Sequence, residues 1–188
     1  MIFNMIMNFL KKNNLKQGNG GFTLVESIVA IFILLISVVM PMSVVARALF
    51  AANYAQDQIT AVYLAQEAIE VVRTTRDNNV LSGTALWDQG NLGDGSSTSC
   101  YSGSGCYVDA VNNTINACGG VCPNIQENSA GVISWYGNYS DWANTKYVRT
   151  IKLSKISAYE IKINSTVTWV SRSGDRTVSV EDVLTNWP

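Results

Sequence analysis

The longest hydrophobic stretch of the chain lies near its start. No charged residue occurs from Ser27 to Ala46, and Ile, Leu, Val, Phe, Met and Ala fill most of these positions. A helix needs about 20 apolar residues to cross a bilayer. The pattern therefore predicts a membrane-spanning helix over residues 22–46, and Pro41 inside it removes one backbone hydrogen bond and favours a kink.

The residues before this stretch form a basic segment that begins with a more apolar part, Met1 to Ile6, and in which Met7 is as good a start as Met1. Residues 1–21 contain Lys11, Lys12 and Lys16, followed by Asn, Gln and Gly. Positively charged flanks of membrane helices stay in the cytoplasm. We therefore expect a cytoplasmic leader and place everything after Met42 outside the cytoplasm.

The stretch after the apolar run stays helical in pattern but becomes amphipathic. Over residues 47–76, apolar residues recur mostly three and four positions apart with polar residues between them. The apolar positions are Ala52, Ala55, Ile59, Val62, Ile69 and Val72. Glu70 and Arg73 have the spacing of an ion pair on a helix surface. The stripe predicts a second helical half that packs against a sheet.

Residues 77–129 show little regular pattern, because Gly, Ser, Asn, Thr and Asp dominate and favour turns. The segment contains four cysteines, at Cys100, Cys106, Cys118 and Cys122. An even number outside the cytoplasm favours disulfides. Three pairings are possible, and sequence order favours Cys100 with Cys106 and Cys118 with Cys122. A four-thiolate zinc site fits these spacings poorly, and we expect no metal and no cofactor.

From residue 130 to residue 188 the pattern changes to alternation of apolar and polar positions, which is typical of strands. We expect a short strand at residues 132–136, a second at 147–153, a third at 159–169 and a fourth that begins at Val178. The sequence Ser173-Gly174-Asp175-Arg176 predicts a hairpin turn between the last two. The expected fold is α+β, with one long N-terminal helix on an antiparallel sheet of about four strands and a disulfide-stapled loop between them.

Charge and composition narrow the function classes. No Lys or Arg occurs from Asp77 to Thr145, whereas Lys146 to Arg176 holds seven basic residues against two acids. Such segregation suggests electrostatic matching between parts of the chain or between subunits. The chain contains no histidine, which excludes Ser-His, Cys-His and His-zinc chemistry within one chain. We expect a protein that is not an enzyme.

The junction between leader and apolar run carries a specific motif. The string Gly21-Phe22-Thr23-Leu24-Val25-Glu26 follows the basic leader and precedes the apolar run. It resembles the processing site of type IV pilins and of the pseudopilins of type II secretion. The resemblance implies that a membrane-embedded prepilin peptidase cuts between Gly21 and Phe22 and methylates the new amine of Phe22. It covers only about residues 18–45, and the order of helix, loop and sheet is also that of the family.

The carboxylate of Glu26 needs an explanation of its own. A lone acid that faces hydrocarbon costs on the order of 2.5–3.5 kcal/mol, so it requires a partner or marks a function. If staggered helices of many copies pack together, Glu26 of one subunit can pair with the Phe22 ammonium of another and fix the register. The alternative is local: Thr23 and Glu26 have the spacing of a capping box. We favour the assembly role, since a capping box explains neither Gly21-Phe22 nor the leader.

Two further alternatives concern processing and binding. The leader and apolar run also resemble an ordinary secretory signal with cleavage after Ala46 or Ala48, but the run is longer than the usual h-region and contains Glu26. Aromatic residues and nearby cations suggest a surface that binds DNA or a glycan. These residues are Trp135, Tyr136, Tyr139, Trp142, Tyr147, Trp169 and Trp187, with Arg149, Lys152, Lys155 and Lys162. We favour the simpler interpretation, in which the aromatics fill the core and the lysines face solvent.

The sequence therefore predicts a structural subunit of a type IV pilus-like or type II secretion-like filament, and more specifically a minor subunit. The resemblance implies other pilin subunits, the prepilin peptidase, an inner-membrane assembly platform and membrane lipid as partners. We expect a single-pass protein of the cytoplasmic membrane that moves into a filament at the cell surface. The alternative is a membrane-anchored or secreted adhesive protein that binds a glycan or DNA through residues 78–128.

Overall fold

The computed structural model describes residues 21, 23–83, 86–89, 92, 100–101, 103–128, 133–134, 142–172 and 174–186. One helix, α2 (Leu24–Ser82), runs through 59 residues. The chain divides into two units, of which the first ends at Leu49 and the second begins at Phe50. Helix α2 contributes to both, so its two parts are described separately. The helix ends six residues beyond the predicted end at Arg76.

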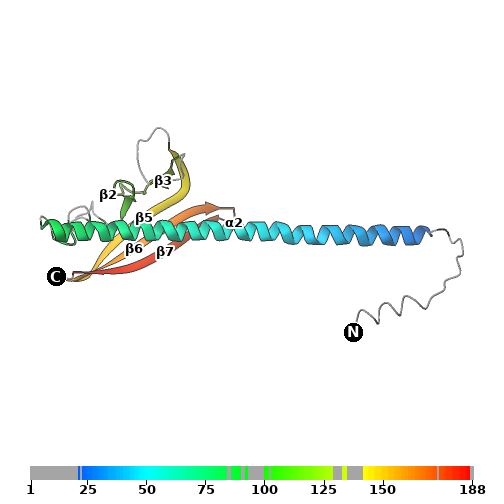
Figure 1. Cartoon of the computed structure of the whole chain (residues 1–188), viewed down its shortest axis with the longest axis horizontal. Helices are drawn as coiled ribbons and strands as arrows, with labels where there is room; N and C mark the ends of the chain where they lie inside the picture. The colour runs from blue at the N-terminus through cyan, green and yellow to red at the C-terminus, as the bar shows by residue number, and fades with distance from the viewer. Residues whose placement is uncertain are drawn as a thin grey trace. The chain divides into compact units, whose positions relative to one another are not determined.

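The second unit contains a seven-stranded antiparallel sheet (Figure 1). Its strands are β1 (Cys106–Asp109), β2 (Thr114–Ala117), β3 (Asn124–Glu127), β4 (Ile133–Ser134), β5 (Ala143–Ser157), β6 (Glu160–Ser171) and β7 (Gly174–Thr185). The last three form a meander of long strands, in which β6 pairs with both β5 and β7. The other edge of β5 is shared by β1 and β3, which carry β2 and β4 as their outer neighbours.

The alternation predicted for the long strands is confirmed in β6, where partly buried and buried positions alternate from Glu160 to Trp169. Side chains of successive strand residues point to opposite faces of a sheet. The buried residues are Ile161, Ile163, Ser165, Val167 and Trp169. Tyr159, which we expected as the first residue of this strand, is 68% exposed because it lies in the turn between β5 and β6.

The predicted hairpin turn between β6 and β7 is shifted toward the N-terminus. Strand β7 already begins at Gly174, so Asp175 and Arg176 are strand residues rather than turn residues. Gly174 has a φ of 106°, a conformation that glycine adopts without the steric cost that a Cβ brings. Ser173 lies outside the described residues.

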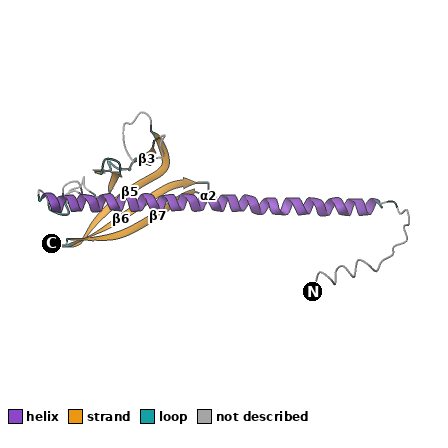
Figure 2. Ribbon diagram, in the orientation of Figure 1, coloured by secondary structure: helices purple, strands orange, loops and turns teal. Residues whose placement is uncertain are grey.

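The apolar stripe of α2 packs on the sheet from Ala61 onward, as the crossing of the helix over the strands in Figure 2 shows. The buried helix residues are Ala61, Leu64, Ala65, Ala68, Ile69, Val71, Val72 and Thr75. Three of these are alanines, whose small side chains allow close approach of helix and sheet. The earlier part of the predicted stripe is wrong: Ala52, Ala55 and Ile59 are exposed. The side of these turns that contacts β5 carries Asp57 instead, which pairs with Lys146.

A buried cation joins the helix to the sheet. Arg149 on β5 is 1% exposed and donates to the backbone oxygens of Leu64 at 2.8 Å and Val108 at 3.0 Å. Its guanidinium also pairs with the carboxylate of Glu67 on α2. Burial lowers the pKa of Arg149, and the Glu67 carboxylate opposes this shift. Arg149 is therefore a core residue that ties α2, β1 and β5 together.

The four cysteines form two disulfides, Cys100–Cys106 and Cys118–Cys122. The pairing favoured by sequence order is confirmed. All four cysteines are buried, and Cys100 and Cys106 belong to the main hydrophobic core together with Val108, Ile151 and Leu153. The first bridge closes a short loop that ends at the start of β1, and the second closes the loop between β2 and β3. These three strands are only four residues long. The strands β1, β2 and β3 lie in a segment where composition had predicted only turns.

Candidate functional site: the N-terminal helix

The start of α2 is capped by Thr23. The backbone N–H of Glu26 donates to Thr23 Oγ1 at 3.3 Å, and the N–H of Ser27 donates to the Thr23 carbonyl at 3.2 Å. A threonine oxygen at this position satisfies one of the free N–H groups of the first turn. The structure thus contains one of the two hydrogen bonds of the capping box considered above.

The Glu26 carboxylate does not complete that capping box. A full box requires this carboxylate to accept a hydrogen bond from the Thr23 N–H. Between residues that the structure describes, neither this bond nor any other hydrogen bond or ion pair of the Glu26 carboxylate occurs. Glu26 is exposed in the first helical turn, where the helix dipole favours a negative charge. Its carboxylate is therefore accessible to a group outside the described part of the chain.

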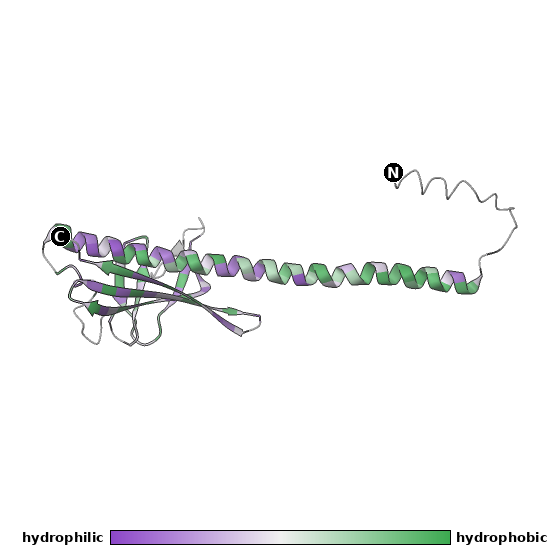
Figure 3. Cartoon of the chain, turned by 90° about the horizontal axis from the view of Figure 1, so that it is seen from below, coloured by the Kyte–Doolittle hydropathy of each residue, from purple (hydrophilic) through white to green (hydrophobic). Residues whose placement is uncertain are grey.

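The first unit presents an apolar surface on all sides of the helix. From Leu24 to Leu49, every residue that the structure places in α2 is exposed, and this part of the helix is long and apolar enough to cross a membrane. Figure 3 shows hydrophobic residues around most of its length. A helix that is apolar all round requires a nonpolar environment such as lipid or the interior of a helical assembly.

The hydroxyls of two serines inside this apolar segment bond within the helix. The hydroxyls of Ser37 and Ser43 donate to the backbone oxygens of Leu34 and Met40, each at 2.8 Å. In hydrocarbon, an unsatisfied polar group costs several kcal/mol, so such internal bonds suit the segment to lipid. Pro41 lies inside the helix, where it leaves the carbonyl of Ser37 without its usual N–H donor. The kink at Pro41 stays a prediction.

The two residues of the predicted cleavage site are described unequally. Gly21 is exposed, and no atom would lie within 4 Å of a Cβ added to it. Phe22 and the leader before Gly21 lie outside the described residues. Gly21 is thus accessible in the structure, while its role in processing stays a prediction.

Other candidate surfaces are dispersed by the fold. Arg149 is buried, Lys155 pairs with Asp88 at 2.7 Å, and Lys162 pairs with Glu181 at 2.7 Å. Trp169 and Tyr147 lie in the core, with ring centroids 6.1 Å apart. Trp135, Tyr136, Tyr139 and Trp187 lie outside the described residues. In the described ranges, no three His, Cys, Asp or Glu side chains gather in a group that could hold a metal ion.

The structural role of Arg149 was not predicted from the sequence. In hindsight its position gives a signal, because Tyr147, Arg149, Ile151 and Leu153 share one face of β5 and the other three are buried. A cation at an inward-facing strand position requires a buried partner. Because Arg149 is buried, it does not contribute positive charge to the candidate surface for DNA or glycan.

The N-terminal region of the chain matches the model of one known protein motif. Residues 16–40 match the model of the prokaryotic N-terminal methylation motif. The match includes the last part of the leader, Gly21, Glu26 and most of the apolar run. Searches of curated proteins and of solved structures found no match. The chain therefore carries the signature of the type IV pilin family at its N-terminus, over 25 of its 188 residues.

Proposed function

We propose that the protein is a minor structural subunit of an extracytoplasmic filament of the type IV pilus or type II secretion kind, assembled through the first part of α2. The observation that carries this proposal is a helix that is apolar on all sides and begins with an acid. In the described part of the chain, that acid has no partner. Neither lipid anchoring nor capping of the helix requires such an acid.

Processing creates the group that the acid lacks. Cleavage by a prepilin peptidase after Gly21 exposes an N-terminal amine on Phe22, which stays cationic at neutral pH even when it is methylated. Glu26 would lie one helical turn from its own amine and within reach of the amine of a staggered neighbour. Pairing the two charges offsets part of the cost of placing either in an apolar helix bundle. The pair therefore favours one axial register between subunits.

Processing also changes the charge of the chain. Removal of residues 1–21 takes away three of the 13 basic residues, which leaves 10 basic against 14 acidic side chains and a net charge of −4. The loss of these lysines removes the charges that hold the leader in the cytoplasm. Loss of the leader thus permits the helix to leave the membrane for a filament core through an inner-membrane assembly platform.

The test compares Glu26→Gln and Glu26→Ala with wild type in the source cells, by measuring the protein in sheared surface filaments relative to membranes. A capping box accepts Gln as well as Glu, whereas an ion pair requires the charge. We expect both variants to lower incorporation by about tenfold or more, as the loss of about 1.4 kcal/mol per contact predicts.

Glu70→Ala is the matched control, because Glu70 is an exposed acid of the same helix that pairs with the neighbouring Arg73. It should leave incorporation within about twofold of wild type. Normal incorporation of Glu26→Gln together with a loss in Glu26→Ala would assign Glu26 to capping and contradict the proposed ion pair. Normal incorporation of both variants would contradict the assembly role of Glu26 altogether.

A further inference from the structure

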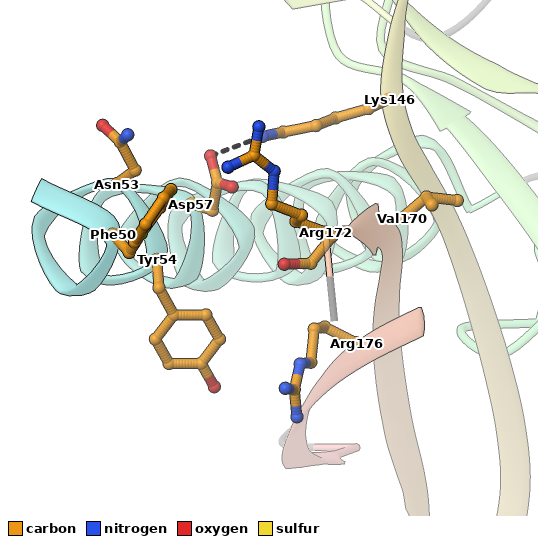
Figure 4. Close-up of a pocket in the computed structure, with 9 residues that line it drawn as sticks. Phe50, Asn53, Tyr54, Asp57, Lys146, Val170, Arg172 and Arg176 are labelled. Atoms are coloured by element: carbon orange, nitrogen blue, oxygen red, sulfur yellow. Dashed lines mark ion pairs between the residues drawn. The ribbon is translucent and has the colours of Figure 1, made fainter. Parts of the chain in front are cut away.

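The second unit contains a cavity of about 740 Å³ between α2, the start of β5 and the β6–β7 hairpin (Figure 4). Its volume lies in the range of pockets that bind ligands. The lining includes Phe50, Asn53 and Asp57 from the helix, Lys146 from β5, and Ser171 and Arg172 from the hairpin.

One cation of this cavity has no acid partner in the described part of the chain. The Asp57 carboxylate pairs with Lys146 Nζ at 2.6 Å, as the dashed line in Figure 4 shows. Arg172 is exposed, and no carboxylate of a described residue pairs with it. Arg176 also lines the cavity, but it has further contacts of its own. Arg172 is therefore the cation that the cavity offers to a partner.

The hydrogen-bond donors of Arg172 stay accessible in its present position. Its guanidinium lies 5.1 Å from the ring centroid of Phe50. Such stacking uses the flat face of the guanidinium, whereas its N–H donors lie along the edge and match the two oxygens of a carboxylate. The side chains of Asn53 and Ser171 make no hydrogen bond with another described residue and add neutral donors and acceptors. The cavity is thus suited to an acidic side chain with polar surroundings.

The segment that contains no Lys or Arg, residues 77–145, is the natural source of such an acid. The fold neutralises or buries most of its acids that the structure describes. Two of them form ion pairs and one is 4% exposed. These are Asp77 with Arg76 at 2.7 Å, Asp88 with Lys155 at 2.7 Å, and the buried Asp109.

Glu127, the last residue of β3, is the remaining described acid of this segment. It is exposed, and no ion pair joins it to a described residue. Every Lys and Arg after Gly21 belongs to the described residues, so residues 22–188 hold no other cation that pairs with Glu127. Within the described ranges, Glu127 and Arg172 are thus exposed opposite charges without an ionic partner.

We propose that the end of β3 of one copy of the chain docks at this cavity on a second copy, where Glu127 accepts hydrogen bonds from Arg172. Complementary charges on two surfaces fix their orientation and register. Because the contact joins two different surfaces of the same chain, it can repeat from copy to copy in a row. The contact rests on the proposed function and adds that copies of this chain are direct neighbours in the filament.

Lys152 provides the matched control. It is also exposed, and no described carboxylate pairs with it. However, it lies opposite Asn164 in the sheet and does not line the cavity. Lys152→Glu and Arg172→Glu make the same change in net charge, so only docking at the cavity distinguishes them.

The test uses the full chain in the source cells, with the photoactivatable residue p-benzoylphenylalanine in place of Val170, which lines the cavity and is 69% exposed. Sheared filaments are irradiated, and a denaturing gel separates the cross-linked dimer. Cleavage at acidic residues and mass spectrometry then locate the cross-link, because trypsin has no site from Asp77 to Thr145. We expect the cross-link in or next to β3 of the second copy.

Charge reversal tests the pair itself. Arg172→Glu and Glu127→Arg should each lower the yield of cross-linked dimer by about fivefold, because attraction becomes repulsion. The combined variant Arg172→Glu/Glu127→Arg restores the attraction and should return the yield to within about twofold of wild type, as should Lys152→Glu alone. Recovery in the combined variant also excludes misfolding as the cause of the two losses.

Three results would overturn this contact. They are no recovery in the combined variant, an equal loss in Lys152→Glu, and a cross-link to another part of the chain or to a different protein. If the chain occurs in filaments but the cross-link lies elsewhere, this contact fails while the proposed function stands. If the chain is absent from sheared filaments, the proposed function fails and this contact fails with it.

Discussion

The two parts of α2 have the same secondary structure for opposite reasons. From Leu24 to Leu49 the helix is apolar around its whole circumference, and no residue that the structure places there is buried. From Ala61 to Thr75 it is apolar on one side only, and that side is buried against the sheet. The first part lacks partners within the described chain, while the second part has its partners within the same unit.

Because of this difference, the two parts of α2 contribute differently to the stability of the second unit. Packing against β5, β6 and β7 stabilises the second unit, because most helical stability in proteins comes from burial of an apolar face. The first part cannot stabilise the second unit in this way, since its apolar surface faces outward. Its surface therefore serves interactions with lipid or with other helices. Matched substitutions in the two parts should have very different effects on unfolding.

The largest expected effect on stability comes from the buried arginine. Arg149→Ala leaves Glu67 and two backbone oxygens without their donor, and such a loss costs about 3–5 kcal/mol. Arg47→Ala removes an exposed arginine of the first part and should change the unfolding free energy by less than about 0.5 kcal/mol. Denaturant unfolding of the full chain in detergent, followed by Trp fluorescence, measures both. Equal effects would contradict the contrast between the two parts of α2.

A smaller effect is expected from one substitution made at two sites. Val72 is fully buried, whereas Val38 is 65% exposed. Val72→Ala should destabilise the second unit by about 1.5–3 kcal/mol, because each buried methylene contributes roughly 0.8 kcal/mol and a cavity remains. Val38→Ala should change stability by no more than about 0.5 kcal/mol. The same denaturant experiment compares them, and a large effect of Val38→Ala would show that the first part stabilises the second unit.

The smallest expected effect concerns alkaline pH. Burial and the nearby Asp57 carboxylate raise the pKa of Tyr147 to about 12. Since an unfolded tyrosine ionises near pH 10, the protonated hydroxyl contributes stability that is fully present below about pH 10 and is lost between about pH 10 and 12. Unfolding measured from pH 8 to 11 should show this loss in wild type and less of it in Tyr147→Phe. Tyr159→Phe, at an exposed position, should behave as wild type.

The sequence predicted the first part of α2 better than the rest of the chain. An uncharged run with one acid at its start has few structural interpretations, so the membrane helix, its motif and the α+β fold class follow from local pattern. The cysteine pairing was also predictable, because short loops bring neighbouring cysteines together. These features depend on residues that lie close together in the chain.

Features that depend on distant residues were harder to predict. Strand β2 has four residues, of which only Ile115 is buried, so its sequence resembles that of a turn. It is a strand because it pairs with β1. The exposure of Ile59 depends on which side of the helix the sheet covers, and Asp57 rather than Ile59 contacts β5. Arg149 resembled a surface cation because its partners Leu64 and Glu67 are more than 80 residues away in sequence.

We propose that the protein is processed as a pilin precursor and assembled through its N-terminal helix. The most direct test is the intact mass and N-terminal sequence of the native protein, taken from membranes and from a sheared surface fraction of the source cells. We predict a mature chain that starts at N-methylated Phe22 in both fractions. A start near Arg47 or Leu49 would indicate an ordinary signal peptide, and an uncut start at Met1 or Met7 would indicate a plain membrane anchor; either result would contradict the claim.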